Sequence, residues 1–296
     1  MGTKTFDPLA VLGLYTETPL HCGSESSAGY VDLPVQRERH TDFPVIPGST
    51  IKGVLRDEFV SRLKREGKVL DQVDQVFGKA EGKDNKTSGA AGSVSFGDGM
   101  LVAFPVRSSI HPFHWVTCPF ALERVYRALR EDLPKGIGSV KIGEALAKEG
   151  GPVLLEEITV TKGQSDALFG KDGTLNRLLD LIPRDNRGFE YTRSILLDRL
   201  LVVSDADFTE LVKTGTEVLT RIKLDEVTGT TSGKSGNMFV EEVVPPETLF
   251  FCALRSAAPG VLPVDDIPEL LRIGGDETIG RGLTHVATVD LTGQVR

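Results

Sequence analysis

A polar stretch near the N-terminus holds the first residues that could do chemistry. Residues 16–42 form a long run of polar residues and glycines that contains His21 and Asp32. Histidine and aspartate commonly transfer protons near neutral pH, and loops of this length inside a compact domain are usually either functional or disordered. One histidine and one aspartate eleven residues apart do not define a site by themselves, because a solvated aspartate is the ordinary case.

The segment that follows has the composition of an anion-binding helix start. Gly48 and Ser49 open a predicted helix, with Ser49 as its N-cap, and the unpaired N–H groups of such a start attract phosphate. Lys52 and Arg56 are four residues apart and therefore share one helical face. The segment could hold phosphate groups, or it could be an ordinary capped helix with exposed charges.

A glycine-rich segment near the C-terminus is the third candidate. Residues 273–282 contain Gly274, Gly275, two further glycines and Arg281. Glycines let a backbone lie close to a polymer, and the planar guanidinium of arginine suits phosphate. The segment lacks the spacing of a Walker loop or a dinucleotide fingerprint. The alternative is a tight turn before a strand.

The charge balance limits the kind of partner. The chain has 34 lysines and arginines against 42 acids, a net charge of −8, whereas a free-standing nucleic-acid-binding domain is usually basic. The balance is uneven, since residues 35–65 hold seven lysines and arginines, Arg37 and Arg39 among them, against four acids. The net charge therefore argues against a free-standing nucleic-acid binder, while the locally basic stretch suits a protein that holds nucleic acid in one groove.

Cysteine usage and hydropathy bear on the compartment. The three cysteines are far apart and lack metal-ligand spacing, which is typical of reduced thiols in the cytosol. The first residues lack the apolar run of a signal peptide, and no segment approaches the roughly 20 apolar residues of a membrane span. We therefore expect a cytoplasmic protein with no membrane partner.

The candidate segments are linked by an irregular mixture of strands and helices. Apolar residues at helical spacing predict helices, and short apolar or alternating runs predict strands. The predicted strands are residues 10–15, 194–203, 218–224, 238–244, 249–254 and 284–291, and residues 93–106 are expected to form a strand or a hairpin. The predicted helices are residues 47–63, 69–77, 121–133, 175–181, 207–213 and 265–273. Residues 218–224 and 238–244 are expected to form a hairpin, and residues 134–158 an irregular insertion. A mixture without a regular βα repeat indicates the α+β class.

Several blocks, taken in order, resemble one family. The pattern Asp-x-Pro-x-Gln-Arg-Glu-Arg-His at residues 32–40 is highly specific. The other matching blocks are residues 18–24, 43–49, 52–56, 104–108, 221–224, 228–230, 241–245 and 273–282, the last of which RAMP proteins share generally. Over nearly its whole length the chain resembles the repeated backbone subunit of type III-B (Cmr) CRISPR effector complexes, a family of the RAMP superfamily.

The resemblance implies an α+β fold with an RRM-like (ferredoxin-like) palm in a single domain spanning residues 1–296. Inserted helical fingers are expected at about residues 60–92 and 134–190, and a thumb-like β-hairpin at residues 218–244. Copies of the subunit would stack in a helical filament along a CRISPR guide RNA, beside other subunits of the complex. Each copy would cut the paired target RNA at one position.

The resemblance also implies roles for individual residues. The family's catalytic aspartate falls on Asp32, its loop histidine on His21 and the first glutamate of its hairpin on Glu241. The RNA-binding positions are Gly48, Ser49, Lys52, Arg56, Arg37, Arg39, Gly274, Gly275 and Arg281. Where a family member carries a tyrosine two residues after that glutamate, this chain has Val243, so a role for the tyrosine is absent or filled differently.

RNA cleavage by such a subunit requires few chemical groups from the protein. The RNA 2′-OH is itself the nucleophile, so the subunit need only align it and help to move protons or bind a cation. Asp32 is therefore expected to act as a base or as a ligand of a divalent metal, Mg²⁺ or Mn²⁺. No organic cofactor is expected.

Three other readings of the sequence compete with this one. The nearest is a catalytically inert RAMP scaffold that only binds guide RNA, and the requirement for Asp32 separates the two. A nuclease that processes precursor CRISPR RNA is disfavoured by the block at residues 32–40 and by the hairpin. A metal-dependent enzyme acting on small molecules is disfavoured because the sequence has no compact ligand cluster.

Overall fold

The first strand, β1 (Asp7–Thr16), lies at the centre of the fold because both of its faces are buried. Ala10, Leu12 and Leu14 belong to one apolar core, whereas Val11 and Tyr15 belong to a second. Successive side chains of a strand point to opposite faces. The sheet that contains β1 therefore separates two cores, and each core needs its own covering layer.

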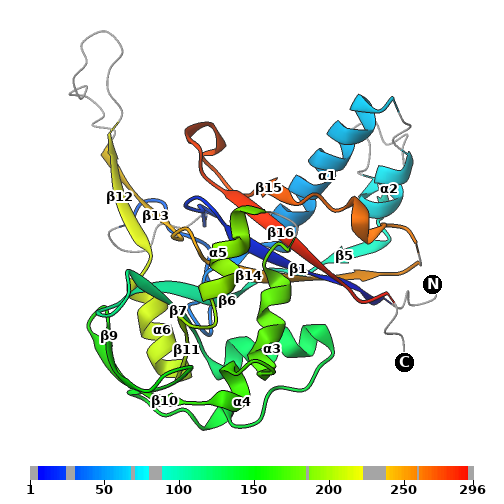
Figure 1. The fold of residues 1–296 in the computed structure, drawn as a ribbon. Coiled ribbons are helices and arrows are strands. Elements are labelled where there is room, and N and C mark those ends of the chain that lie inside the picture. The colour runs from blue at the N-terminus through cyan, green and yellow to red at the C-terminus, as the bar shows by residue number, and fades with distance from the viewer. Residues whose placement is uncertain are drawn as a thin grey trace.

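The structure is a computed structural model that describes residues 6–24, 31–67, 71–79, 89–184, 187–222, 238–258 and 260–292. Besides β1, the strands of its main sheet are β2 (Val45–Ile46), β5 (Val94–Phe96), β6 (Gly99–Arg107), β7 (Phe113–Thr117), β8 (Glu144–Ala147), β9 (Gly151–Leu155), β10 (Ile158–Gln164), β11 (Leu200–Val203), β14 (Leu249–Ser256), β15 (Leu270–Arg272) and β16 (Leu283–Asp290). Their order is β15-β16-β1-β14-β6-β7-β11-β8-β10-β9, with β2 paired to β6 and β5 to β14 (Figure 1). A separate short ladder joins β3 (Gly78–Lys79) to β4 (Ala90–Ala91). The strands around β1 are antiparallel.

The first core is covered by helices that follow β1 in the chain. α1 (Gly48–Arg65) buries Ile51, Leu55, Phe59 and Leu63, and their four-residue spacing places them on one helical face. This face packs into the core that contains the even-numbered residues of β1. α2 (Asp71–Phe77) and α6 (Asp205–Thr214) contribute to the same core.

The second core is covered by α3 (Pro119–Leu129) and the 3₁₀ helix η2 (Thr174–Leu181). η2 crosses β1 at Gly13, where an added Cβ would lie 2.1 Å from the carbonyl oxygen of Leu181. Only glycine allows two backbones to approach this closely. The remaining short helices are α4 (Asp166–Phe169), α5 (Glu190–Ile195), η1 (Ile137–Ser139), η3 (Arg187–Phe189), η4 (Val264–Asp266) and η5 (Glu277–Ile279).

A two-stranded hairpin projects from the main sheet (Figure 1). Its strands, β12 (Glu217–Ile222) and β13 (Met238–Val243), pair in the antiparallel register that joins Glu217 to Val243 and Ile222 to Met238. This confirms the predicted hairpin and shortens its arms slightly. The predicted tip, residues 223–237, lies outside the described residues.

The α+β class is confirmed, but two predicted elements are wrong. Residues 265–273 do not form a helix, because Pro268 interrupts a helical backbone and the strand β15 instead extends the sheet beyond β16. Residues 194–203 do not form one strand, because α5 continues to Ile195 and only β11 pairs in the sheet. In both segments the contacts made in the folded protein, and not the local apolar pattern, determine the secondary structure.

The inserted segments also differ in detail from expectation. The segment at 134–190 carries β8, β9 and β10 as well as short helices, so it extends the main sheet instead of being purely helical. The segment 134–158, expected to be irregular, contains two of these strands. α1 begins at Gly48 after Pro47, and no side chain caps it, so Ser49 is not the N-cap.

The cysteines agree with the prediction of reduced thiols. Cys22, Cys118 and Cys252 are buried and free. Burial raises the pKa of both Cys22 and Cys252 to about 12, so these thiols stay protonated and unreactive at neutral pH. No helix among the described residues is long and apolar enough to cross a membrane.

The contact at Gly13 leads to a stability prediction. Gly13→Ala should lower the free energy of unfolding by about 1–3 kcal/mol or more, because the new methyl group must push η2 off β1. Urea unfolding of the purified chain measures this loss. Gly53→Ala is the matched control, since nothing lies within 4 Å of a Cβ there, and it should stabilise α1 by about 0.5–1 kcal/mol. Equal effects of the two substitutions would contradict the packing argument.

Candidate functional site

The loop that carries Asp32 is held against the hairpin as an extra strand. The N–H groups of Asp32 and Leu33 both donate to the carbonyl of Val240 at 3.0 Å, and the N–H of Glu242 donates to the carbonyl of Leu33 at 3.0 Å. The Asp32 carboxylate also accepts a hydrogen bond from the N–H of Val240 at 2.8 Å. Asp32 is nevertheless exposed, so its second carboxylate oxygen can meet a ligand from solution.

His21 lies beside the same strand in a defined tautomeric state. Its Nδ1 is 2.8 Å from the carbonyl oxygen of Glu242, and its side chain is largely buried. Because a carbonyl can only accept, Nδ1 must carry the proton and donate it. In the neutral ring, Nε2 then keeps the lone pair and can accept a proton. Asp32 and His21 thus bond to positions of β13 that are two residues, or roughly 7 Å, apart.

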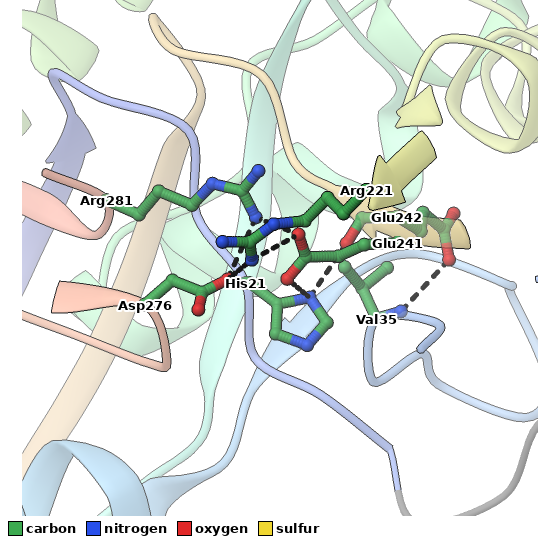
Figure 2. A network of polar contacts seen from close by, with 7 residues as sticks. All are labelled: His21, Val35, Arg221, Glu241, Glu242, Asp276 and Arg281. Carbon is green, nitrogen blue, oxygen red and sulfur yellow. Dashed lines mark hydrogen bonds and ion pairs between the residues drawn. The ribbon is translucent and has the colours of Figure 1, made fainter. Parts of the chain in front are cut away.

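A buried ion-pair network surrounds Glu241, the second residue that the resemblance marked as catalytic. Glu241 is 1% exposed and forms ion pairs with Arg281 and with Arg221, the latter at 3.2 Å. Its carboxylate is also 3.8 Å from His21 Nδ1. Asp276 pairs with Arg221 at 2.8 Å and with Arg281 at 3.1 Å (Figure 2). A side-chain hydrogen bond with Glu241 and the charges of the two guanidinium groups lower the pKa of Asp276.

Glu242 forms a second polar cluster on the opposite side of β13. It is 8% exposed and accepts hydrogen bonds from the N–H of Val35 at 2.9 Å, from Arg37 at 2.5 Å and from Thr216 at 2.7 Å. Burial acts to raise the pKa of Glu242, but the hydrogen bonds from Arg37 and Thr216 outweigh it and lower that pKa. Sequence reasoning missed Glu242. The signal available was a pair of adjacent glutamates within an apolar strand pattern.

The glycine-rich segment packs against the loop that carries His21. Gly275 N–H donates to the carbonyl of His21 at 2.8 Å. Gly274 has a φ of +90°, and a Cβ there would lie 2.3 Å from the same carbonyl oxygen. Glycine is therefore needed at Gly274 for contact within the protein, although Gly274 and Gly275 both stay exposed on their outer side. The segment positions His21 and supplies Arg281 to Glu241.

The predicted RNA-binding residues of α1 lie in a separate groove. Ser49, Lys52 and Arg56 line a cavity of about 380 Å³ that also contains Lys79. Gly48 does not open onto this groove, because it is buried and its N–H donates to Asp98 at 2.7 Å. A Cβ at Gly48 would lie 2.7 Å from the carbonyl oxygen of Phe96, so close packing explains this glycine.

The structure thus divides the predicted site residues into two groups. The elements that meet at β13 bring together Asp32, His21, Glu241, Arg281, Gly274, Gly275 and Arg37. The α1 groove gathers Ser49, Lys52 and Arg56, while Arg39 is exposed on the loop after residue 37. Val243, where a family member carries tyrosine, is fully buried in β13. A hydroxyl role at that position is absent from this chain.

The described residues include no group of three or more His, Cys, Asp and Glu side chains that could hold a metal ion. Asp32 offers one carboxylate oxygen, since the Val240 N–H occupies part of the group. Mg²⁺ often binds proteins through one or two carboxylates and completes its shell with water and substrate phosphates. The residues present fit that mode of binding and no closed protein cage.

Fold and site together define an α+β protein with a polar site at the base of a projecting hairpin. A family model described as the RAMP superfamily matches residues 14–285. A curated protein of Pyrococcus furiosus, named CRISPR system Cmr endoribonuclease Cmr4, is 32% identical over 300 residues, which are 95% of this chain and 96% of that protein. The chain belongs to the RAMP superfamily and, within it, to the Cmr4 family.

Solved structures with the same fold support this placement. The crystal structure of oligomeric Cmr4 from Pyrococcus furiosus has a TM-score of 0.66 and 28% identity, covering 97% of this chain and 99% of that one. A chain of the type III-B Cmr-beta complex bound to cognate target RNA, seen by cryo-electron microscopy, has a TM-score of 0.73 and 22% identity. That match covers 96% of this chain and 98% of that one, and it shows the shared fold.

The ion-pair network predicts that Arg281 stabilises the protein itself. Arg281→Ala should lower the free energy of unfolding by about 1.5–3 kcal/mol, because the buried Glu241 carboxylate loses one of its two arginine partners and keeps Arg221. Urea unfolding of the purified chain is the measurement. Arg272→Ala is the control, since its ion pair with Glu277 is exposed, and it should cost about 1 kcal/mol or less. Similar losses for both variants would show that the Arg281 pair is no stronger than a surface pair.

Proposed function

We propose that this chain is a CRISPR-RNA-binding filament subunit of a type III-B effector complex, and that it cleaves complementary target RNA at regular intervals. The observation that carries the proposal is Asp32, an exposed carboxylate held by the hairpin strand beside a histidine of defined tautomer. The match to a protein named a CRISPR endoribonuclease supports the reaction, and the match to an oligomeric crystal structure supports the filament.

An RRM-like palm is supported by the order of the central strands. Counting only β1, β6, β14 and β16 as strands 1 to 4, their order across the antiparallel sheet is 4-1-3-2. This is the order of a ferredoxin-like fold, in which a helix follows the first strand, as α1 does here. Between β14 and β16 the second helix of that fold is replaced by η4 and β15. The proposed palm is thus a ferredoxin-like sheet whose second helix is replaced by a short 3₁₀ helix and an edge strand.

The proposed reaction uses the RNA as its own nucleophile. The 2′-oxygen attacks the adjacent phosphorus, the bond to the 5′-oxygen breaks, and a cyclic phosphate and a 5′-hydroxyl result. Asp32 accepts the 2′-OH proton or holds a cation near it, and His21 Nε2 is a second group able to accept a proton. The departing 5′-oxygen takes up a proton from the group that accepted one, or from water, and so leaves as a hydroxyl. Glu241 is paired with two arginines, so it supports the site by holding Arg281, Arg221 and His21 in place.

A divalent cation, Mg²⁺ or Mn²⁺, is the proposed cofactor, with Asp32 as its protein ligand. When bound, it would offset negative charge at the phosphate that is being cut. The rest of the cleavage depends on alignment, because an attacking 2′-oxygen must lie in line with the leaving oxygen. The protein's own part is to hold Asp32 in a fixed position next to Val240 of β13.

The α1 groove is the proposed contact with the guide RNA. Ser49, Lys52 and Arg56 point into one cavity together with Lys79, and Arg39 adds an exposed charge on the loop that carries Asp32. Arg56 is 3.5 Å from Asp74, and both side chains are 42% exposed, so a phosphate can compete for this guanidinium. The partners are guide RNA, target RNA, further copies of the chain and other complex subunits, in the cytoplasm.

The hairpin is the proposed contact with the RNA duplex and with the next copy. Val218 and Ile222 of β12 and Met238 of β13 are 56%, 53% and 63% exposed. The register of the two strands puts these three side chains on one face. A two-stranded ribbon with an apolar exposed face is marginal in water alone, so it requires a partner surface.

The second candidate function is a guide-RNA-binding scaffold without catalysis. It is favoured by the state of Glu241, whose charge is already offset within the protein. It gives no role to the hydrogen bond by which the Val240 N–H fixes the Asp32 carboxylate to β13. Cleavage by complexes that carry only Asp32 variants separates the two functions.

Asp32→Ala should reduce target cleavage by at least about 100-fold while leaving assembly and target binding nearly unchanged, because a group that moves a proton or holds a cation is lost. Asp32→Asn should do the same and still accept the Val240 N–H. The measurement is cleavage of labelled target RNA by a complex reconstituted with guide RNA. Asp57→Asn, an exposed acid on α1, is the control. Regular cuts at the wild-type rate from the Asp32 variants would favour the scaffold.

Replacing Lys52 and Arg56 by glutamine should weaken guide-RNA binding and flatten its dependence on salt. Each lost phosphate contact should reduce the slope of log K against log salt by roughly 0.7. Anisotropy titrations of labelled guide RNA at several salt concentrations give both quantities. Lys64→Gln with Arg65→Gln, which removes the same charge at the other end of α1, should have a smaller effect. Equal slopes for both pairs of variants would contradict binding in the groove.

A further inference from the structure

The position of Asp32 depends on contacts made several residues further along the loop. Backbone hydrogen bonds join the loop to β13 only at Asp32, Leu33 and Glu242, as far as the described residues show. Beyond Leu33, the attachment passes to a side chain, because the N–H of Val35 donates to the Glu242 carboxylate at 2.9 Å. The loop therefore relies on Glu242 to continue the strand-like pairing that begins at Asp32.

The Glu242 carboxylate ties together three segments. One oxygen binds Val35 of the loop, and the other accepts hydrogen bonds from Arg37 at 2.5 Å and Thr216 at 2.7 Å. Arg37 in turn donates to Thr216 at 3.1 Å and to the carbonyl of Asp42 at 2.7 Å. The cluster thus holds the loop at Val35 and at Arg37 and joins it to Thr216, the residue just before β12.

The guanidinium of Arg37 is engaged by hydrogen bonds within this cluster. It also forms the Glu242 ion pair, and the Arg37 side chain is 19% exposed. Arg37, expected from the sequence to bind RNA, therefore has a structural task, whereas the nearby Arg39 is exposed. The cluster of Glu242, Arg37 and Thr216 uses its polar groups on one another and on the loop. It is therefore suited to positioning Asp32 and not to contacting RNA.

We propose that Glu242, through Arg37 and Thr216, is a positioning residue that sets the placement of Asp32 for cleavage. The proposal deepens the proposed function and rests on it. Without the Glu242 charge, the Arg37 guanidinium loses its ion pair, and the carboxylate no longer offers one oxygen to Val35 and the other to Arg37 and Thr216. The attachment of the loop to β13 then depends on the backbone bonds of Asp32 and Leu33, while Ser24 and Gln36 still join it to the preceding segment through Pro34 and Cys22. Asp32 then samples positions away from the scissile phosphate, and misplacement by about 1 Å can slow an enzyme roughly 100-fold.

The experiment uses complexes reconstituted with guide RNA and one form of this chain. Glu242→Gln keeps the size of the side chain and removes its charge, and Thr216→Val removes one donor of the cluster. Glu217→Gln is the matched control, because Glu217 is an exposed glutamate on the same hairpin. Two quantities are measured for each complex: the single-turnover cleavage rate at saturating target RNA, and the Kd for the target. Hydrogen exchange of residues 31–37 and of β14 is followed in parallel.

Glu242→Gln should lower the cleavage rate by about 10–100-fold and change the target Kd by less than about twofold. Exchange should speed up in residues 31–37 and stay unchanged in β14. Thr216→Val should give a smaller loss of cleavage rate, again without a change in the target Kd. This variant tests the proposal if complexes with Glu242→Gln fail to assemble. The control should match wild type in every respect.

A wild-type cleavage rate and unchanged exchange in Glu242→Gln would overturn the proposal. A loss that appears entirely in the target Kd would also overturn it, because it would make the cluster an RNA contact. If the wild-type complex itself does not cut, the proposed function fails instead. The exchange measurement then still decides whether Glu242 orders the Asp32 loop.

Discussion

Two adjacent carboxylates buried in one strand constrain the whole site. Glu241 and Glu242 are 1% and 8% exposed, and a buried carboxylate without a partner costs several kcal/mol. Because neighbouring side chains of a strand point to opposite faces, the two glutamates cannot share a partner. Glu241 takes Arg281 and Arg221 on one side, and Glu242 takes Arg37 on the other. The loop, the glycine-rich segment and the first hairpin strand are thereby fixed to β13.

This arrangement separates the charged groups that hold the structure from those that can react. The charges of Glu241 and Glu242 are offset by ion pairs with arginines. The hydrogen bonds of Glu242 lower its pKa despite burial. Asp32 remains exposed with one oxygen still available, and the carbonyl of Glu242 leaves Nε2 of His21 as the accepting nitrogen. The two groups proposed to transfer protons, Asp32 and His21, are both hydrogen-bonded to β13. The rigid pair behind them limits how far either can move.

The parts of this fold that the sequence could predict are those with local signals. The burial of α1 follows from apolar residues four apart, and the hairpin arms from short β-rich runs. The role of Glu242 could not be predicted in this way, because its partner Arg37 lies 205 residues earlier in the chain. The composition of the glycine-rich segment fits either a surface for a polymer or a tight turn, and Gly274 is required by its contact with the His21 carbonyl. In both cases the missing information was which distant segment lies next to the residue. Asp32 and His21 stand out as candidate catalytic residues only because their sequence blocks resemble those of a family.

The same ion pairs explain how an acidic chain can be a subunit that holds RNA. Arg37 and Arg281, both expected to bind phosphate, are engaged by buried glutamates. In the α1 groove, the cations that the structure describes are Lys52, Arg56 and Lys79, and so few charges bind a polyanion weakly. Weak binding per subunit is compatible with tight binding by a filament, because linked sites act at a high effective concentration along one RNA. A single free copy would then release RNA readily, and cleavage would be restricted to assembled complexes in which neighbouring copies hold the same guide.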